Sequence, residues 1–213
     1  YLTVRDAPDD LIAALQRHKH DHAEHGAAHY YAVRAWDRAP GWASVLPVRR
    51  AARMIYLNKT CYNGLWRVNS RGQFNVPMGR YRRPDILNEK RLRAASRALQ
   101  GAEIAVAGFE RVLEHARAGD FVYCDPPYVP LSATANFTTY SAASFGEAEQ
   151  RRLAEVFAAL DRQGCRVMLS NSDTPLVRAL YRAFRIETVS ARRNINSARH
   201  KRGAVSEVVV LNY

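Results

Sequence analysis

Near the middle of this 213-residue chain lies the segment FVYCDPPY, residues 121–128. Its first four residues are apolar or aromatic, which predicts a short buried strand over 121–124. Two consecutive prolines then end the strand, because proline donates no backbone hydrogen bond and fixes its own φ angle. Ligands of open α/β sheets bind at the carboxyl ends of the strands, so we expect a ligand-facing loop over 125–128.

This loop offers the groups needed to hold a planar base with an exocyclic amine. The Asp125 carboxylate and the Pro126 carbonyl can each accept one amine hydrogen, while Pro127 stiffens the loop. Tyr128 adds an aromatic face for stacking. Drawing both hydrogens toward acceptors frees the nitrogen lone pair for attack on an electrophile. The alternative is that D-P-P-Y is only a turn. The apolar strand before it and a basic region upstream favour a site.

From Gly101 onward, short apolar runs alternate with amphipathic stretches. The pattern predicts strands at 103–107, 121–124 and 165–170, and helices at 109–116, 147–161 and 174–184. This alternation is typical of an α/β fold with a mostly parallel, doubly wound sheet. Two further runs, 184–190 and 206–213, are expected to form a final antiparallel pair of strands.

The residues before Gly101 predict helices and one β-hairpin. Helices are expected from Asp9 or Asp10 to His20, around Tyr30–Trp36, from Pro47 onward, and from a cap at Asn88 to Gly101. The segment 66–76 alternates about Asn69-Ser70-Arg71-Gly72, which indicates a hairpin. The chain therefore divides into a helical region (1–48), a basic region with the hairpin (49–100) and an α/β domain (101–213).

The positive charge is concentrated in the basic region. The chain has 32 Lys+Arg against 20 Asp+Glu, a net charge of +12. Residues 49–93 contain twelve basic side chains, opposed only by Asp85 and Glu89. A second basic cluster lies at 192–202. Solvated helix faces usually alternate in sign, so this distribution favours a polyanionic partner bound through phosphates.

The composition excludes several classes of protein. A hydrophobic content of 47% and a charged content of 24% are those of a folded globular chain rather than a disordered or collagen-like one. No apolar run is long enough for a membrane span. Three separated cysteines predict neither a disulfide framework nor a structural zinc site, and we expect a cytoplasmic protein. Cys124 is expected to be a buried thiol, and the histidines of residues 18–29 a solvated helix surface.

Four segments, 57–81, 122–140, 169–174 and 192–197, resemble the Dam-type DNA adenine methyltransferases. The resemblance implies a class I, Rossmann-like methyltransferase fold with a helical and β-hairpin target-recognition insert at 49–100. It implies transfer of a methyl group from S-adenosylmethionine to N6 of adenine in double-stranded DNA, usually within GATC. Asp125, Pro126, Pro127 and Tyr128 would then hold an adenine turned out of the duplex.

The same resemblance implies the residues that contact DNA and cofactor. Tyr62 would wedge into the base stack, with Asn63 at the backbone, and Arg67 would read a guanine through O6 and N7. Leu65 and Pro77 would make apolar contacts, and Arg80 and Tyr81 would touch the backbone. The remaining implied DNA contacts are Asn136, Phe137, Arg192 and Arg193. Phe109, Asp125 and Pro126 would contact the cofactor.

Two features depart from the family pattern. Residues 1–50 contain no G-x-G loop, so we expect the first strands of the methyltransferase sheet to be missing and the catalytic domain, 101–213, to be partial. Gly108 stands where the family commonly has Asp, although Phe109 remains for stacking. A DNA-binding module without catalysis is therefore the alternative function. Transfer to N4 of cytosine is a weaker alternative, because Asp as the first residue of the loop, at Asp125, and the Dam-like hairpin argue against it.

Overall fold

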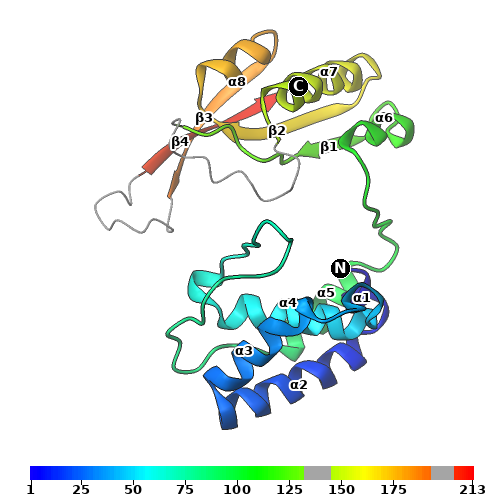
Figure 1. The fold of residues 1–213 in the computed structure, drawn as a ribbon. Coiled ribbons are helices and arrows are strands. Elements are labelled where there is room, and N and C mark those ends of the chain that lie inside the picture. Colours follow the sequence, from blue (N-terminus) through cyan, green and yellow to red (C-terminus); the bar gives the residue numbers. More distant parts are fainter. Residues whose placement is uncertain (132–144, 193–203) are drawn as a thin grey trace. The chain divides into compact units, whose positions relative to one another are not determined.

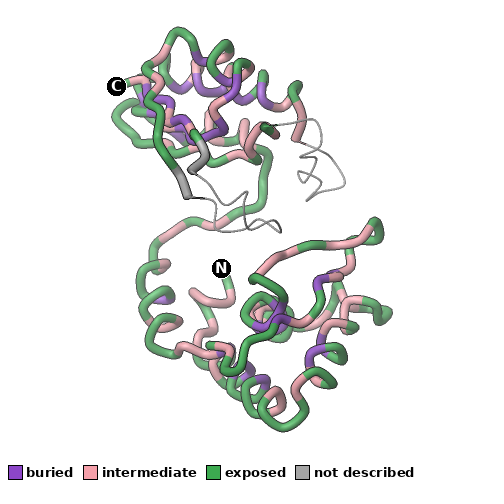
Figure 2. The backbone as a smooth tube through the Cα atoms, turned by 90° about the vertical axis from the view of Figure 1, so that its left-hand side faces the viewer, coloured by how far each residue is buried: buried purple, intermediate pink, exposed green. Residues whose placement is uncertain are grey.

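The computed structural model describes residues 1–131, 145–192 and 204–213, which form two compact units, Tyr1–Ala105 and Val106–Tyr213 (Figure 1). Figure 2 shows that each unit has its own set of buried residues. The predicted regions 1–48 and 49–100 lie together in the first unit. None of the helices formed by the described residues is long and apolar enough to cross a membrane.

The first unit is helical. Its α-helices are α1 (Leu2–Asp6), α2 (Pro8–His25), α3 (Ala27–Ala35), α4 (Pro47–Thr60) and α5 (Glu89–Ala98). Pro47 begins α4 as predicted, and the Asn88 side chain caps α5 by accepting from the Arg91 N–H at 3.0 Å. The prediction that Asp9 or Asp10 caps α2 was wrong. Pro8 already occupies the first turn, where its missing N–H needs no partner.

The predicted hairpin is present as a tight turn with isolated bridges rather than as two strands. Val68 bridges Phe74, and the Gly72 N–H donates to the Asn69 carbonyl at 2.9 Å. The hairpin is anchored on the helices by Asp37, whose carboxylate accepts from the Phe74 N–H at 2.8 Å. Asp37 also pairs with the buried Arg53 at 2.7 Å. Arg53 is therefore a structural cation, and counting it among the phosphate-binding charges was wrong.

The histidines of α2 and α3 contribute to the core of the first unit. His18 is only 6% exposed, its Nδ1 lies 3.0 Å from His29 Nε2, and its ring stacks on Tyr56 with centroids 4.7 Å apart. The expected solvated surface was therefore wrong at His18, because the ring fills space between helices. Burial, and after it the like charge of His29, lower the pKa of His18 to about 4.

The second unit is built on a four-stranded sheet in the order β1-β2-β4-β3. The strands are β1 (Phe121–Cys124), β2 (Arg166–Ser172), β3 (Arg185–Arg192) and β4 (Ala204–Leu211). β1 and β2 are parallel, whereas β4 runs antiparallel to both β2 and β3. The final antiparallel pair is confirmed. A mostly parallel sheet is not found in the described residues, whose sheet is mixed.

Segment 103–107 forms no strand, contrary to its prediction. Residues 102–108 have no regular structure, and Val106 is fully exposed. A strand needs a neighbour to satisfy its backbone groups. Among the described residues, β1 pairs only with β2, and no strand lies beside 103–107. Apolar composition alone therefore did not make this segment a strand.

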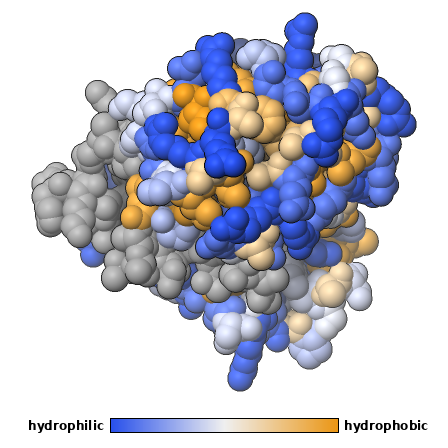
Figure 3. Space-filling model, turned by 90° about the horizontal axis from the view of Figure 1, so that it is seen from above, coloured by the Kyte–Doolittle hydropathy of each residue, from blue (hydrophilic) through white to orange (hydrophobic). Residues whose placement is uncertain are grey.

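Helices cover one face of the sheet. These are η4 (Phe109–Arg111), α6 (Val112–His115), α7 (Glu147–Arg162) and α8 (Pro175–Leu180). Their apolar residues pack on the inward residues of all four strands, including Val167, Leu169 and Val210. On the other face Phe121 and Tyr123 are more than half exposed. Figure 3 views the molecule from above and shows hydrophilic side chains interspersed with hydrophobic ones.

The buried His18 makes the stability of the first unit depend on pH. Its pKa is about 4 in the folded state and near 6.5 when exposed, so below pH 6.5 the unfolded state binds the extra proton. We expect the free energy of unfolding to fall by about 2 kcal/mol from pH 7 to pH 5. Urea unfolding followed by tryptophan fluorescence measures this, since Trp36, Trp42 and Trp66 all lie in the first unit.

His18→Gln supplies the control for this prediction. It removes the titrating ring, so most of the difference in stability between pH 7 and pH 5 should disappear, even if the variant is less stable at both. An unchanged pH dependence in His18→Gln would show that another group is responsible.

Candidate active site

The parallel pairing of β1 with β2 places Asp125 beside Ser170. The register aligns Cys124 with Leu169, and Asp125 and Ser170 are the next residues on the two chains. Ser170 Oγ donates to Asp125 Oδ1 at 3.0 Å, and the Tyr123 hydroxyl lies 2.8 Å from Ser170 Oγ. The carboxylate of the D-P-P-Y loop is thus held by a side chain of the neighbouring strand.

A second set of hydrogen bonds fixes the loop backbone. Gln150 of α7 donates through Nε2 to the Pro127 carbonyl at 2.8 Å, and its Oε1 accepts from Asn171 Nδ2 at 3.1 Å. Asn171 Oδ1 in turn accepts from the Val129 N–H at 3.0 Å. Gln150 and Asn171 are 2% and 0% exposed. We call this set the amide clamp (Gln150 and Asn171). Buried amides that are fully paired fix one backbone conformation.

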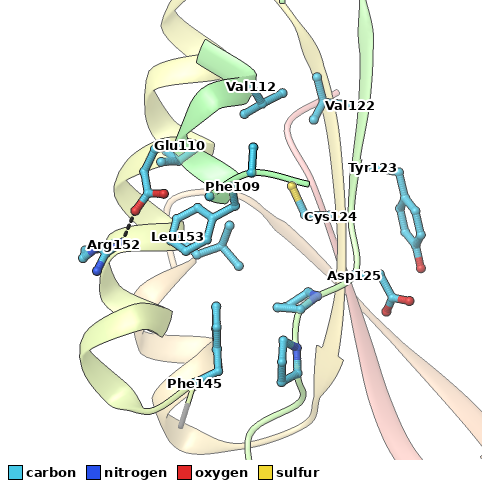
Figure 4. Close-up of a pocket in the computed structure, with 15 residues that line it drawn as sticks. Phe109, Glu110, Val112, Val122, Tyr123, Cys124, Asp125, Phe145, Arg152 and Leu153 are labelled. Atoms are coloured by element: carbon cyan, nitrogen blue, oxygen red, sulfur yellow. Dashed lines mark hydrogen bonds and ion pairs between the residues drawn. The ribbon is translucent and has the colours of Figure 1, made fainter. Parts of the chain in front are cut away.

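A cavity of about 530 Å³ lies beside the loop (Figure 4). Its lining is mainly apolar, with Phe109 and Phe145 edge to face at 5.8 Å and Pro126 and Pro127 from the loop. Such volume and lining are typical of small-molecule sites. Figure 4 shows the Asp125 carboxylate on the other side of β1 from Phe109. The loop therefore borders the cavity while its carboxylate faces β2.

Two charged side chains lie at the cavity. Glu110 and Arg152 form an ion pair, and Arg152 also lies over the Phe109 ring, 5.4 Å from its centroid. The hydrogen bond from Arg152 lowers the pKa of Glu110. Cys124 also lines the cavity, and burial raises the pKa of its thiol. A thiol held in its neutral form is a poor nucleophile, as expected, although Cys124 is only partly buried rather than buried.

The predicted cofactor residues fit one part of S-adenosylmethionine. The Phe109 ring and the Pro126 ring offer apolar faces that suit a planar purine. At Gly108 a side chain would approach Glu110 Oε2 to 2.8 Å, so the backbone there lies close to the ion pair. Phe109 and Pro126 would hold the adenine ring of the cofactor.

In the first unit the structure brings the predicted DNA-contacting segments together. The Tyr62 N–H donates to the Pro77 carbonyl at 2.9 Å, and Cys61 bridges Met78. Tyr62 and Tyr81 are 48% and 47% exposed. Asn63 next to Tyr62 has a positive φ of 54°, which asparagine tolerates better than most residues.

Leu65, Arg67 and Arg80 complete this surface. Arg67 and Arg80 are exposed, and Leu65 is half-buried. Arg67 Nε donates to Asn75 Oδ1 at 2.7 Å, which leaves the two terminal nitrogens of the guanidinium for another partner. Asn136, Phe137 and Arg193 lie outside the described residues. Arg192 ends β3, and its side chain is likewise outside the description.

Sequence reasoning missed Gln150. Its signal lies in the helical spacing, since Gln150 occupies the same face of α7 as Leu153, Phe157 and Leu160, all of which are buried. A polar residue at a core position needs a buried partner. Ser170 contacts Asp125, and Thr174 caps α8 by accepting from the Val177 N–H at 3.3 Å.

Comparisons with known proteins identify the family of the chain. Residues 1–195 match the family described as D12 class N6 adenine-specific DNA methyltransferase, and the chain belongs to this family. The sequence is 39% identical, over its whole length and 75% of the relative, to the type II methyltransferase M1.LlaDCHI of Lactococcus lactis subsp. cremoris.

Two further relatives match a shorter part of the chain. It is 45% identical to the type II methyltransferase M.MjaIII of Methanocaldococcus jannaschii over 78% of its own length and 58% of the relative. It is 42% identical to the DNA adenine methylase of Escherichia coli K12, again over 78% of its length and 59% of the relative. The chain thus spans between 58% and 75% of the length of these three relatives.

The amide clamp predicts a stability effect. Gln150→Leu removes the acceptor for the buried Asn171 amide and the donor to the Pro127 carbonyl, so one buried polar group is left unpaired. We expect the free energy of unfolding of the second unit to fall by about 1–3 kcal/mol. Hydrogen exchange of β2 and α7 peptides, read by mass spectrometry, measures it.

The matched control for the amide clamp is Gln163→Leu. It makes the same change at an exposed residue just after α7, whose amide bonds only the Leu113 carbonyl. The control variant should leave the hydrogen-exchange protection of the β2 and α7 peptides nearly unchanged. Equal effects of the two variants would contradict a special role for the amide clamp.

Proposed function

We propose that this chain carries the catalytic loop and the DNA-recognition surface of an adenine-N6 DNA methyltransferase that acts on GATC sites. The observation that carries the proposal is the D-P-P-Y loop, held at the end of β1 by Ser170 and the amide clamp beside a cavity of about 530 Å³. Membership of the D12 family supports it.

The loop residues supply the chemistry at the target base. The Asp125 carboxylate and the Pro126 carbonyl each accept one hydrogen of the adenine N6 amine, and Tyr128 stacks on the ring. This arrangement directs the N6 lone pair outward and holds the adenine in the geometry for attack. S-adenosylmethionine, when bound, supplies a methyl group on a sulfonium sulfur. The chain's own groups orient the amine and accept its hydrogen bonds. As the N–C bond replaces the S–C bond, N6 would lose one proton, which passes by way of these acceptors to solvent.

The cavity suits the adenine end of the cofactor, with Phe109 and Pro126 against the ring. Gly108 offers no carboxylate there, and Glu110 is engaged by Arg152. The described residues therefore recognise the cofactor chiefly through apolar contact. A chain that binds GATC duplexes without transferring a methyl group is the second candidate function, and Gly108 is the observation that favours it.

The first unit offers one side chain suited to reading a base. The Nε of Arg67 is held by Asn75, so its two terminal nitrogens are oriented for the O6 and N7 acceptors of guanine. Tyr62 is exposed next to the hairpin and can fill the space left by a flipped adenine. Most other basic residues of 49–93 would contact phosphates and fix the register on the duplex.

Methyl transfer by this chain tests the catalytic proposal. The assay measures the incorporation of labelled methyl groups from S-adenosylmethionine into a duplex with one GATC site. The control duplex carries N6-methyladenine at that site in both strands. We expect incorporation only into the unmethylated duplex, and a loss of at least about 100-fold in Asp125→Ala without loss of DNA binding. Binding without transfer by the unchanged chain would favour the second candidate function.

Arg67→Ala tests the recognition proposal. It removes a bidentate contact, so the ratio of kcat/KM on GATC to kcat/KM on a duplex with the guanine replaced should fall about 5- to 150-fold. Arg71→Ala removes the same charge at the tip of the hairpin and should weaken activity equally on both duplexes. If Arg67→Ala keeps the full preference for GATC, Arg67 does not read the guanine.

A further inference from the structure

We infer that Ser170, supported by the Tyr123 hydroxyl, is a positioning residue that fixes the orientation of the Asp125 carboxylate toward the target amine. The inference deepens the proposed function and rests on it for the reaction step. Neither side chain belongs to the D-P-P-Y loop. Tyr123 lies on β1, with its side chain on the side of the strand opposite Phe109 (Figure 4). Ser170 lies on β2 and is within hydrogen-bond distance of the Tyr123 hydroxyl.

The direction of these hydrogen bonds follows from the carboxylate. An ionised carboxylate only accepts, so the single hydroxyl proton of Ser170 must point to Asp125 Oδ1 at 3.0 Å. Ser170 Oγ can then only accept from Tyr123, whose hydroxyl lies 2.8 Å away. The two bonds form a short chain that runs from Tyr123 through Ser170 to Asp125 and ends on one carboxylate oxygen.

This pair of hydrogen bonds fixes the rotation of the Asp125 carboxylate. Oδ1 is occupied by Ser170, whereas Oδ2 has no partner among the described residues. The bond to Ser170 fixes the rotation of the carboxylate about its Cβ–Cγ bond, and this rotation sets the plane of the group. Oδ2 becomes the oxygen that accepts from N6. Small errors in the position of a reacting group cost large factors in rate, so fixing this plane favours the chemical step more than binding.

The surroundings of Ser170 agree with a positioning role. Its side chain belongs to a residue only 8% exposed, whereas Tyr123 is 53% exposed. The rotamer of Ser170 is therefore restricted by packing, while the Tyr123 ring lies on the open face of the sheet. Burial also raises the pKa of Tyr128, the other loop side chain that would hold the adenine.

Ser170→Ala and Tyr123→Phe test the inference, because each removes one hydroxyl and little else. We expect Ser170→Ala to lower the single-turnover methylation rate constant about 10- to 100-fold, and Tyr123→Phe about 3- to 10-fold. The KM values for DNA and cofactor should stay within about twofold. Ser170→Thr keeps the hydroxyl and should restore the rate to within about threefold.

Ser206→Ala is the matched control. Ser206 Oγ donates to Asp173 Oδ2 at 2.9 Å, so this variant deletes another hydroxyl–carboxylate bond of the same sheet. Its methylation rate should be unchanged. An unchanged rate in Ser170→Ala, a loss confined to KM, or an equal loss in Ser206→Ala would overturn the inference.

A spectroscopic measurement separates this inference from the proposed function. The ¹³C resonance of the Asp125 carboxyl, assigned with Asp125→Asn, should shift in Ser170→Ala and in Tyr123→Phe but not in Ser206→Ala. If the unchanged chain transfers no methyl group, the proposed function fails while this resonance still decides whether Ser170 holds Asp125. If the Asp125 carboxyl resonance does not shift in Ser170→Ala, the positioning role is overturned.

Discussion

The parallel pairing of β1 with β2 is the constraint on which the rest of the site depends. Because the two strands run the same way, both end at one edge of the sheet, and the residues that follow Cys124 and Leu169 become neighbours. Alternation along β2 then directs Ser170 to one face and Asn171 to the other. The loop after β1 is consequently held from both faces, at Asp125 by Ser170 and at Pro127 and Val129 by the amide clamp.

The prolines and the amide clamp act together. Proline fixes φ and leaves its carbonyl free, so the loop has few conformations before any contact is made. The buried amides then select one of them, because each alternative would leave a buried donor or acceptor unpaired. In the first unit the same principle anchors the hairpin, where the carboxylate of Asp37 satisfies both Arg53 and the Phe74 N–H. Both units thus use buried polar side chains to place segments that would contact DNA or the target base.

Features set by neighbouring residues were predictable from the sequence, and features set by distant ones were not. Pro47 and Asn88 begin helices through local geometry, and FVYC forms a strand that ends at Asp125. By contrast, the direction of β4 against β2, the missing strand at 103–107 and the burial of His18 each depend on which distant segment lies alongside. The D-P-P-Y loop could be recognised from its residue types. Its supports could not, because Ser170 and Gln150 reach it from 45 and 23 residues away.

The backbone amide of Val129 reports most directly on whether β2 holds the loop. It donates to the side chain of a fully buried asparagine of β2 rather than to a strand backbone, so its exchange with solvent measures this contact itself. Residue-resolved hydrogen exchange by NMR should find this amide strongly protected in the unchanged chain, with protection lost in Asn171→Ala while the amides of β4 that pair with β2 stay protected. Rapid exchange of Val129 in the unchanged chain would contradict the account, because the loop would then be free of β2.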